Sequence, residues 1–140
     1  MISNIITHKV NEKKHLHCKD GPAIVYKNGT QIWYFDDQLH RENGPAFESK
    51  TYKAWYKNGQ RHREDGPAVV YPDGLIEYYQ NNKKHRLDGP AVIYPDGYIE
   101  FWLNNVKYDP NSEEYKLQKT ICEVVVKPDA IFTADFLNEL

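Results

Sequence analysis

The stretch 62–79, His-Arg-Glu-Asp-Gly-Pro-Ala-Val-Val-Tyr-Pro-Asp-Gly-Leu-Ile-Glu-Tyr-Tyr, decides the fold of this chain. It returns in modified form three more times, beginning at His17, His40 and His85. A unit that recurs every 22 or 23 residues is typical of a repeat architecture, in which each unit packs on its neighbours. With a half-unit in front, we expect a repeat array over residues 1–108 and a C-terminal cap or docking segment over residues 109–140.

Each repeat contains two kinds of turn sequence. The first kind suits a three-residue hairpin loop closed by a glycine with positive φ, and it occurs at 27–29, 72–74 and 95–97. The second kind suits a two-residue type I′ hairpin, and it occurs at 36–37, 58–59, 81–82 and 104–105. The runs between turns, such as 68–71 and 99–102, are rich in β-branched and aromatic residues. The sequence therefore predicts a mainly β fold, an elongated antiparallel meander of about nine strands built from tandem hairpins.

A Gly-Pro-Ala step interrupts every repeat. The prolines are Pro22, Pro45, Pro67 and Pro90. Proline has no N–H group, so it breaks the ladder of backbone hydrogen bonds, and we expect a bend or bulge in the second strand of each repeat. An alanine follows each proline, which predicts close contact with the neighbouring repeat.

Two consecutive aromatic residues occupy each repeat, at 33–34, 55–56, 78–79 and 101–102. Successive residues of a strand point to opposite faces, so one aromatic ladder is expected along each face of a twisted or curved sheet. The ladders are expected to form the core. The alternative is that one ladder is partly exposed and binds a partner through Tyr34, Tyr56, Tyr79 and Trp102.

Residues 56–62, Tyr-Lys-Asn-Gly-Gln-Arg-His, resemble the MORN repeat, which has a similar period, an aromatic-x-Asn-Gly turn and a histidine just beyond it. The variant with Asp-Gly-Pro-Ala is similar to repeat proteins of giant DNA viruses, phages and some bacteria, including antitoxin-like members. The resemblance implies an elongated curved sheet that serves as an interaction surface. It also implies an inhibitory, antitoxin or immunity-type role, in the cytoplasm of the host cell if the protein is viral.

A row of arginines follows the motif histidines and consists of Arg41, Arg63 and Arg86. Acidic residues such as Glu64 and Asp65 are interleaved with them. We expect a solvated edge of mixed charge. The alternative is a groove for an acidic or nucleotide-like partner, because guanidinium groups bind carboxylates and phosphates through paired hydrogen bonds.

The four motif histidines suggest a metal site, but their spacing argues against one. Equivalent residues of successive repeats are two strands apart, about 9–10 Å, whereas zinc ligands must converge at about 2.0–2.1 Å from the ion. We therefore expect each imidazole to bond to a turn backbone or to the nearby Asp side chain. The sequence also lacks a phosphate-binding loop and a nucleophile placed beside a histidine and a carboxylate. It predicts no metal, no cofactor and no enzymatic activity.

The net charge and the cysteine content indicate which kinds of partner and which cellular compartment to expect. The net charge is −2, which makes nucleic acid an unlikely partner. No stretch approaches the roughly 18 apolar residues of a membrane span. Cys18 and Cys122 lack the spacing of a disulfide framework, so both are expected to be reduced thiols of a cytoplasmic protein.

The tail departs from the repeat pattern. Ser112 predicts the start of a helix that runs to about Thr120, and residues 121–126 read as a strand. A second short helix is expected to carry Phe132, Phe136 and Leu137. The tail is expected to cap the last hairpin, and the alternative is that these residues dock on a partner or a second subunit.

Together these features predict a non-enzymatic module for protein–protein interaction. A protein partner is expected, and a homodimer is a further expectation. The second hypothesis is a protein that sequesters a nucleotide-like or other anionic small ligand through the arginine and aromatic rows.

Overall fold

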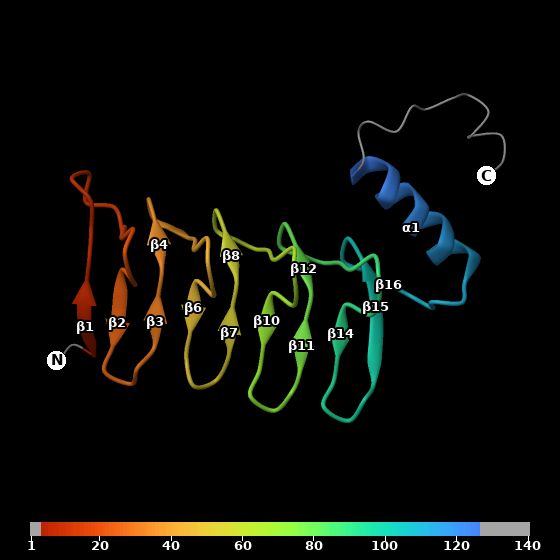
Figure 1. Cartoon of the computed structure of the whole chain (residues 1–140), viewed down its shortest axis with the longest axis horizontal. Coiled ribbons are helices and arrows are strands. Elements are labelled where there is room, and N and C mark those ends of the chain that lie inside the picture. Colours follow the sequence, from red (N-terminus) through yellow and green to blue (C-terminus); the bar gives the residue numbers. More distant parts are fainter. Residues whose placement is uncertain (1–3, 127–140) are drawn as a thin grey trace.

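The computed structural model describes residues 4–126, which form a row of β-hairpins followed by a helix (Figure 1). The long sheet contains β1 (Ile5–His8), β2 (Ile24–Tyr26), β3 (Gln31–Ile32), β6 (Phe47–Glu48), β7 (Lys53–Ala54), β10 (Val69–Val70), β11 (Ile76–Glu77), β14 (Val92–Ile93), β15 (Ile99–Leu103) and β16 (Val106–Tyr108). Separate two-stranded ribbons contain β4 (Tyr34–Phe35), β5 (Gln38–Leu39), β8 (Tyr56–Lys57), β9 (Gln60–Arg61), β12 (Tyr79–Gln80) and β13 (Lys83–Lys84). The helix is α1 (Glu113–Val126).

The sheet is an antiparallel meander. Its ten strands lie in the order β1-β2-β3-β6-β7-β10-β11-β14-β15-β16, and the ribbons pair β4 with β5, β8 with β9 and β12 with β13. Each ribbon continues one long strand of the sheet beyond a single aromatic residue, as Figure 1 shows for β7 and β8. The predicted fold class, a mainly β array of tandem hairpins, is confirmed.

The turns have the predicted types. Gly74 has a φ of 100° and its N–H donates a hydrogen bond to the carbonyl oxygen of Tyr71 at 3.1 Å, which closes the three-residue loop. At the other end of the strands both residues of each two-residue turn have positive φ, for example 48° at Asn81 and 65° at Asn82. Asn, Asp and Gly tolerate this left-handed conformation, so the local turn residues set the hairpin register.

The alanine after each proline lies at the junction between neighbouring strands. The Trp55 N–H donates to the carbonyl oxygen of Ala68 at 2.8 Å, and the Ala68 N–H donates to the carbonyl oxygen of Glu77 at 2.8 Å. The fully buried alanines of this motif are Ala23, Ala46, Ala68 and Ala91. The predicted close contact with the neighbouring repeat is confirmed.

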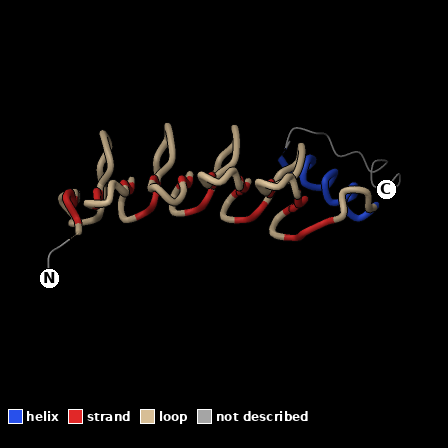
Figure 2. The backbone as a smooth tube through the Cα atoms, turned by 90° about the horizontal axis from the view of Figure 1, so that it is seen from below, coloured by secondary structure: helices blue, strands red, loops and turns tan. Residues whose placement is uncertain are grey.

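The Asp-Gly-Pro step does not form the bulged strand that we expected. The chain leaves the sheet at each motif histidine and returns at the alanine, which makes a projecting loop. We call these the first to fourth loops, at residues 17–23, 40–46, 62–68 and 85–91. Figure 2 shows loops standing out on one side of the strands, with α1 on that same side. Proline has no N–H group for the ladder, and in the second, third and fourth loops an arginine side chain also bonds to the loop backbone, as described below.

The core is thin, and every repeat contributes buried apolar residues to it. One buried cluster contains Ala54, Ala68, Val69 and Tyr79, and half-buried aromatic rings pack against it. Among these, the rings of Phe47 and Tyr52 stack with their centroids 4.6 Å apart. Each repeat therefore buries its apolar side chains mainly against the next repeat, as expected for a linear array.

The helix in the tail is longer than the sequence predicted. The Ser112 Oγ atom accepts a hydrogen bond from the Tyr115 N–H at 3.1 Å, so Ser112 is the predicted N-cap. The helix then runs to Val126, and the strand expected at 121–126 is wrong. Once a helix has begun, each added residue gains a hydrogen bond, which outweighs the strand preference of the β-branched run. The second helix, with Phe132, Phe136 and Leu137, falls outside the described residues.

Candidate functional site

Arginines fasten the second, third and fourth loops to the sheet. Arg63 Nε donates to Asp65 Oδ1 at 2.8 Å, and Arg63 Nη1 donates to the Pro67 carbonyl oxygen at 3.2 Å. The guanidinium Cζ atom lies 4.1 Å from the ring centroid of Trp55. One side chain therefore holds its own loop by two hydrogen bonds and stacks on the strand below.

Arg86 repeats this arrangement in the fourth loop. Its Nε donates to Asp88 Oδ1 at 2.9 Å, its Nη1 donates to the Pro90 carbonyl oxygen at 3.2 Å, and its Cζ lies 4.0 Å from the ring centroid of Tyr78. The hydrogen bond from the arginine lowers the pKa of Asp88, as the equivalent bond lowers the pKa of Asp65. Both carboxylates stay ionised at neutral pH.

The second loop keeps part of this arrangement. Arg41 stacks on Trp33 with its Cζ 4.0 Å from the ring centroid, and its Nη1 donates to the Pro45 carbonyl oxygen at 3.2 Å. Asn43 stands where the later loops have aspartate. All three predicted arginines therefore lie at the bases of loops, with their guanidinium groups already engaged within the chain.

Each motif histidine bonds to the type I′ turn at the far end of its own repeat. The N–H of the first residue in the following type I′ turn donates to imidazole Nδ1, for example from Asn81 to His62 at 3.2 Å and from Asn104 to His85 at 3.1 Å. The predicted bond to a turn backbone is confirmed, and the turn lies 19 residues after the histidine. The Asp of the motif bonds to arginine instead of histidine. Burial lowers the pKa of His85, which keeps its imidazole neutral.

The second aromatic ladder lies on the face opposite the loops, because strand neighbours alternate between faces. It contains Tyr34, Tyr56, Tyr79 and Trp102. Tyr79 is buried, and the Arg61 guanidinium lies 5.2 Å from its ring centroid. Lys84 Nζ lies 5.1 Å from the Trp102 ring centroid. Basic side chains therefore cover part of the ladder that we selected as a candidate binding surface.

At the last repeat, α1 occupies the place that arginine holds elsewhere. Phe101 continues the ladder of Trp33, Trp55 and Tyr78, but Asp109 stands eight residues later in place of arginine. The Tyr115 ring packs edge-on against Phe101, with centroids 5.7 Å apart, and lies 5.9 Å from Tyr108. Tyr115 is buried, so it anchors α1 on the final hairpin.

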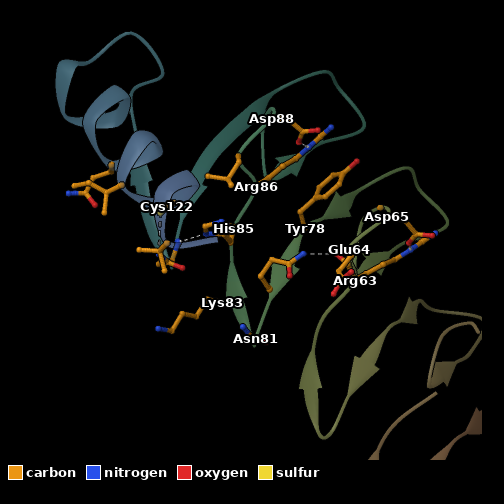
Figure 3. A pocket seen from close by; sticks show the side chains of 17 residues that line it. Arg63, Glu64, Asp65, Tyr78, Asn81, Lys83, His85, Arg86, Asp88 and Cys122 are labelled. Atoms are coloured by element: carbon orange, nitrogen blue, oxygen red, sulfur yellow. Dashed lines mark hydrogen bonds and ion pairs between the residues drawn. The ribbon is translucent and has the colours of Figure 1, made fainter. Parts of the chain in front are cut away.

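A cleft of about 1050 Å³ opens between α1 and the third and fourth loops (Figure 3). Tyr78, between β11 and β12, and Gln80 of β12 form part of its lining, and the loops contribute Arg63, Asp65, Arg86 and Asp88. The helix contributes Gln118, Ile121, Cys122 and Val125. Ile121 is 42% exposed and Val125 is 74% exposed, so the helix wall offers apolar side chains to solvent.

The polar rim of this cleft is mixed in charge. Asp65 and Asp88 are bonded to arginine, whereas Glu64 is largely exposed and lies 3.4 Å from His62 Nε2. Lys83 on β13 adds an exposed cation. Asn104 Nδ2 lies 3.6 Å from Cys122 Sγ, and burial raises the pKa of that thiol. The thiol therefore stays protonated at neutral pH and has little nucleophilic character.

A second cleft, of about 840 Å³, lies between the first and second loops. Trp33 and Phe35 contribute its aromatic surface, and Lys19, Arg41 and Glu42 contribute charge. Unlike the first cleft, it has no helix wall. The repeat geometry thus produces gaps between neighbouring loops, and α1 adds the exposed side chains of Ile121 and Val125 to the C-terminal gap.

The structure brings together only part of the predicted site. Arg63 and Arg86 line the C-terminal cleft, whereas the predicted tyrosine ladder lies on the other face and the predicted residues Phe132, Phe136 and Leu137 are outside the described part of the chain. The sequence reasoning missed the helix residues Gln118, Ile121, Cys122 and Val125. Their three- and four-residue spacing was the available signal, and reading 121–126 as a strand obscured it.

Residues 4–126 contain neither a candidate metal-binding group nor a helix that could span a membrane. No three His, Cys, Asp or Glu side chains in this range are grouped so that they could hold a metal ion. No helix in the same range is long and apolar enough to cross a membrane. Comparison with protein-family models, curated proteins and solved structures gives no significant match to this chain.

Proposed function

We propose that this chain is a non-enzymatic, MORN-like module that binds a partner protein in the cleft between α1 and the third and fourth loops. The observation that carries the proposal is the exposure of Ile121 and Val125 on the wall of that cleft. An apolar centre with a polar rim is the usual arrangement of a protein–protein interface. The partner is expected to insert an apolar side chain between α1 and the fourth loop.

The contacts that the arginine side chains already make favour a protein partner over a small anion. Arg63 and Arg86 each already donate to an aspartate and a backbone carbonyl, and each stacks on an aromatic ring. An anion would have to displace Asp65 or Asp88 from its arginine. The hypothesis of a nucleotide-like ligand therefore has weaker support than a partner that contacts the apolar wall.

Matched substitutions on α1 test the proposal. Ile121 lines the cleft and is 42% exposed, whereas Leu117 is 41% exposed, one turn earlier on the same helix, and does not line it. The tagged full-length chain would be used to capture partners, with wild type, Ile121→Glu and Leu117→Glu compared by quantitative mass spectrometry. We expect Ile121→Glu to lose a stoichiometric protein that Leu117→Glu retains.

The same experiment can refute the proposal. Circular dichroism must first show that both variants keep the helix and sheet content of the wild type. If Ile121→Glu then retains the same partner as the wild type, or if both variants lose it equally, the cleft is not the binding site. A co-purifying nucleotide or other small anion that depends on Arg63 would favour the second hypothesis.

The resemblance to MORN-like repeats of viruses, phages and bacteria extends the proposal to the biological role. We place the interaction in the cytoplasm, in the host cell if the protein is viral, and we propose an inhibitory or immunity-type effect on the partner. The support for this role is the sequence resemblance in the repeat motif, and the support for the binding mode is the geometry of the cleft.

A further inference from the structure

Three junctions between repeats are built in the same way. In each junction, the part of a long strand that precedes its aromatic residue, which we call the lower half, pairs with a strand of the next repeat. These pairs are β3 with β6, β7 with β10 and β11 with β14, and they align Ile32 with Phe47, Ala54 with Val69 and Glu77 with Val92. The added strand always follows the Pro-Ala step. The segments that pair with these strand edges therefore share one pattern. It consists of proline, alanine and two bulky residues, followed by a tyrosine in the last two junctions.

The fourth long strand has no such neighbour among the described residues. The lower half of β15 pairs with β14 on one side, while β16 pairs only with Phe101, Trp102 and Leu103 higher on the strand. Tyr98 is 54% exposed and Ile99 is 44% exposed. The equivalent Ile76 of β11 is only partly exposed, because β14 lies beside it.

The backbone of Ile99 faces this open side. The carbonyl oxygens of Tyr98 and Glu100 accept hydrogen bonds from Tyr94 and Ala91 of the preceding strand, both at 2.8 Å. Hydrogen-bonding groups of successive residues in a strand point to alternate sides. The N–H and C=O groups of Ile99 therefore point away from β14, toward the position that a further strand would occupy.

On one face the side chains at this edge fit an apolar strand, while on the other face Lys107 Nζ of β16 donates to Glu100 Oε1 at 2.7 Å and to Tyr98 OH at 3.3 Å. A cross-strand row on one face contains Val70, Ile76, Ile93 and Ile99, and its last member ends at the open edge. A bulky aliphatic residue opposite Ile99 would continue this row. Tyr115 covers Phe101, two residues further along β15, so α1 anchors above this edge.

We infer that the lower half of β15 binds an extended segment of a partner protein as an added antiparallel strand, with a Pro-Ala-aliphatic-aliphatic-Tyr pattern. Main-chain hydrogen bonds supply affinity in this kind of recognition, and the alternating side chains supply specificity. This edge is separate from the cleft at Ile121. An experiment can therefore refute one of the two proposed binding sites without refuting the other.

The opposite end of the sheet is less suited to this role. β1 is the first strand, and Ile6 is 65% exposed there. However, the register of β1 against β2 shifts between Ile5 and Thr7. Such a bulge disturbs the regular ladder and is a common protection of edge strands. The edge of β15 has regular register up to Ile99.

A peptide titration tests the inference on the full-length protein. The probe is the chain's own segment 88–96, Asp-Gly-Pro-Ala-Val-Ile-Tyr-Pro-Asp, whose Ile93 would lie opposite Ile99 by the register of β11 and β14. The control peptide has proline in place of that isoleucine and so lacks the required N–H. Amide chemical shifts of isotope-labelled protein are followed by NMR.

We expect saturable shifts at the amides of Tyr98 to Phe101 with the matching peptide and at least ten-fold weaker binding of the proline peptide. Ile99→Asp should abolish binding, whereas Val106→Asp, at an equally exposed position on β16, should leave it unchanged. The inference is wrong if millimolar matching peptide causes no shift, if both peptides bind equally, or if the shifts occur at β1. Concentration-dependent dimerisation through Ile99 would also overturn it, because the occupant would then be a second copy.

Discussion

The guanidinium of Arg63 stacks on the ring of Trp55, with Cζ 4.1 Å from the ring centroid, although the two residues are eight positions apart and lie on either side of a type I′ turn. This contact explains the order of residues in the repeat motif. The arginine reaches back to the aromatic strand, the aspartate and the proline carbonyl hold its guanidinium, and the alanine returns the chain to the sheet.

Loss of this arginine should lower the stability of the folded protein. Arg63→Ala removes the stacking on Trp55 and two hydrogen bonds, so we expect a decrease of about 1–3 kcal/mol in the free energy of unfolding. Urea denaturation followed by circular dichroism measures the loss. Lys83→Ala, at an exposed position of β13, is the control and should change little. An Arg63→Ala protein as stable as the wild type would show that the arginine does not fasten the loop.

The glycine of the motif is predicted to matter only where an arginine lies against it. A Cβ atom at Gly66 would approach Arg63 Cζ to 3.0 Å, whereas a Cβ atom at Gly21 would meet nothing within 4 Å, because Cys18 replaces the arginine. Gly66→Ala must displace a guanidinium held by stacking and hydrogen bonds, so we expect a loss of about 1 kcal/mol. Gly21→Ala should be neutral or slightly stabilising. Equal effects in thermal denaturation would contradict this explanation.

Stability should fall as the pH decreases below neutrality. Burial lowers the pKa of His85 from an ordinary value of 6.5, so the unfolded chain binds a proton at this residue before the folded chain does. The contribution of His85 is complete above pH 6.5 and is lost as the pH falls through the lowered pKa of the folded state. Protonation of Nδ1 would also break the hydrogen bond from Asn104.

His85→Gln provides the comparison for this pH dependence. Glutamine can accept a hydrogen bond from the Asn104 N–H but does not titrate. Urea midpoints measured between pH 8 and pH 5 should therefore decline less steeply for His85→Gln than for the wild type. Parallel curves for the two proteins would mean that other groups cause the acid sensitivity.

Tyr115 should control the docking of α1. Its buried ring packs between Phe101 and Tyr108, and Tyr115→Ala removes both contacts, at a cost of about 2–4 kcal/mol. We expect hydrogen exchange in α1 to become fast while exchange in the sheet stays slow. Tyr115→Phe keeps the ring and should preserve protection, as should Leu117→Ala at an exposed position of the helix. Unchanged protection of α1 in Tyr115→Ala would rule out this anchoring role.

The sequence predicted the features that depend on local chemistry. Asn81-Asn82 and Pro72-Asp73-Gly74 specify their turns by the φ angles that these residues tolerate, so the hairpins and their order followed from the sequence. The N-cap at Ser112 followed in the same way. These signals lie within a few neighbouring residues and do not require knowledge of the folded sheet.

The features that the sequence did not reveal depend on contacts across repeats or on packing. Arg63 and Trp55 meet only after the chain has turned and left the sheet, so the sequence alone predicts a solvated row or an anion groove instead of this contact. The run at 121–126 has strand propensity, but it extends a helix that is anchored by Tyr115. The cleft could not be predicted because its helix wall came from this misread segment.

The most direct test of the central claim is hydrogen exchange of the chain alone and in complex with the partner that Ile121→Glu fails to retain. If the partner occupies the cleft, amides in 83–88 and 118–125 should become protected on binding. Protection confined to the opposite face, around Tyr34, Tyr56 and Tyr79, would contradict the claim and place the interaction on the tyrosine ladder.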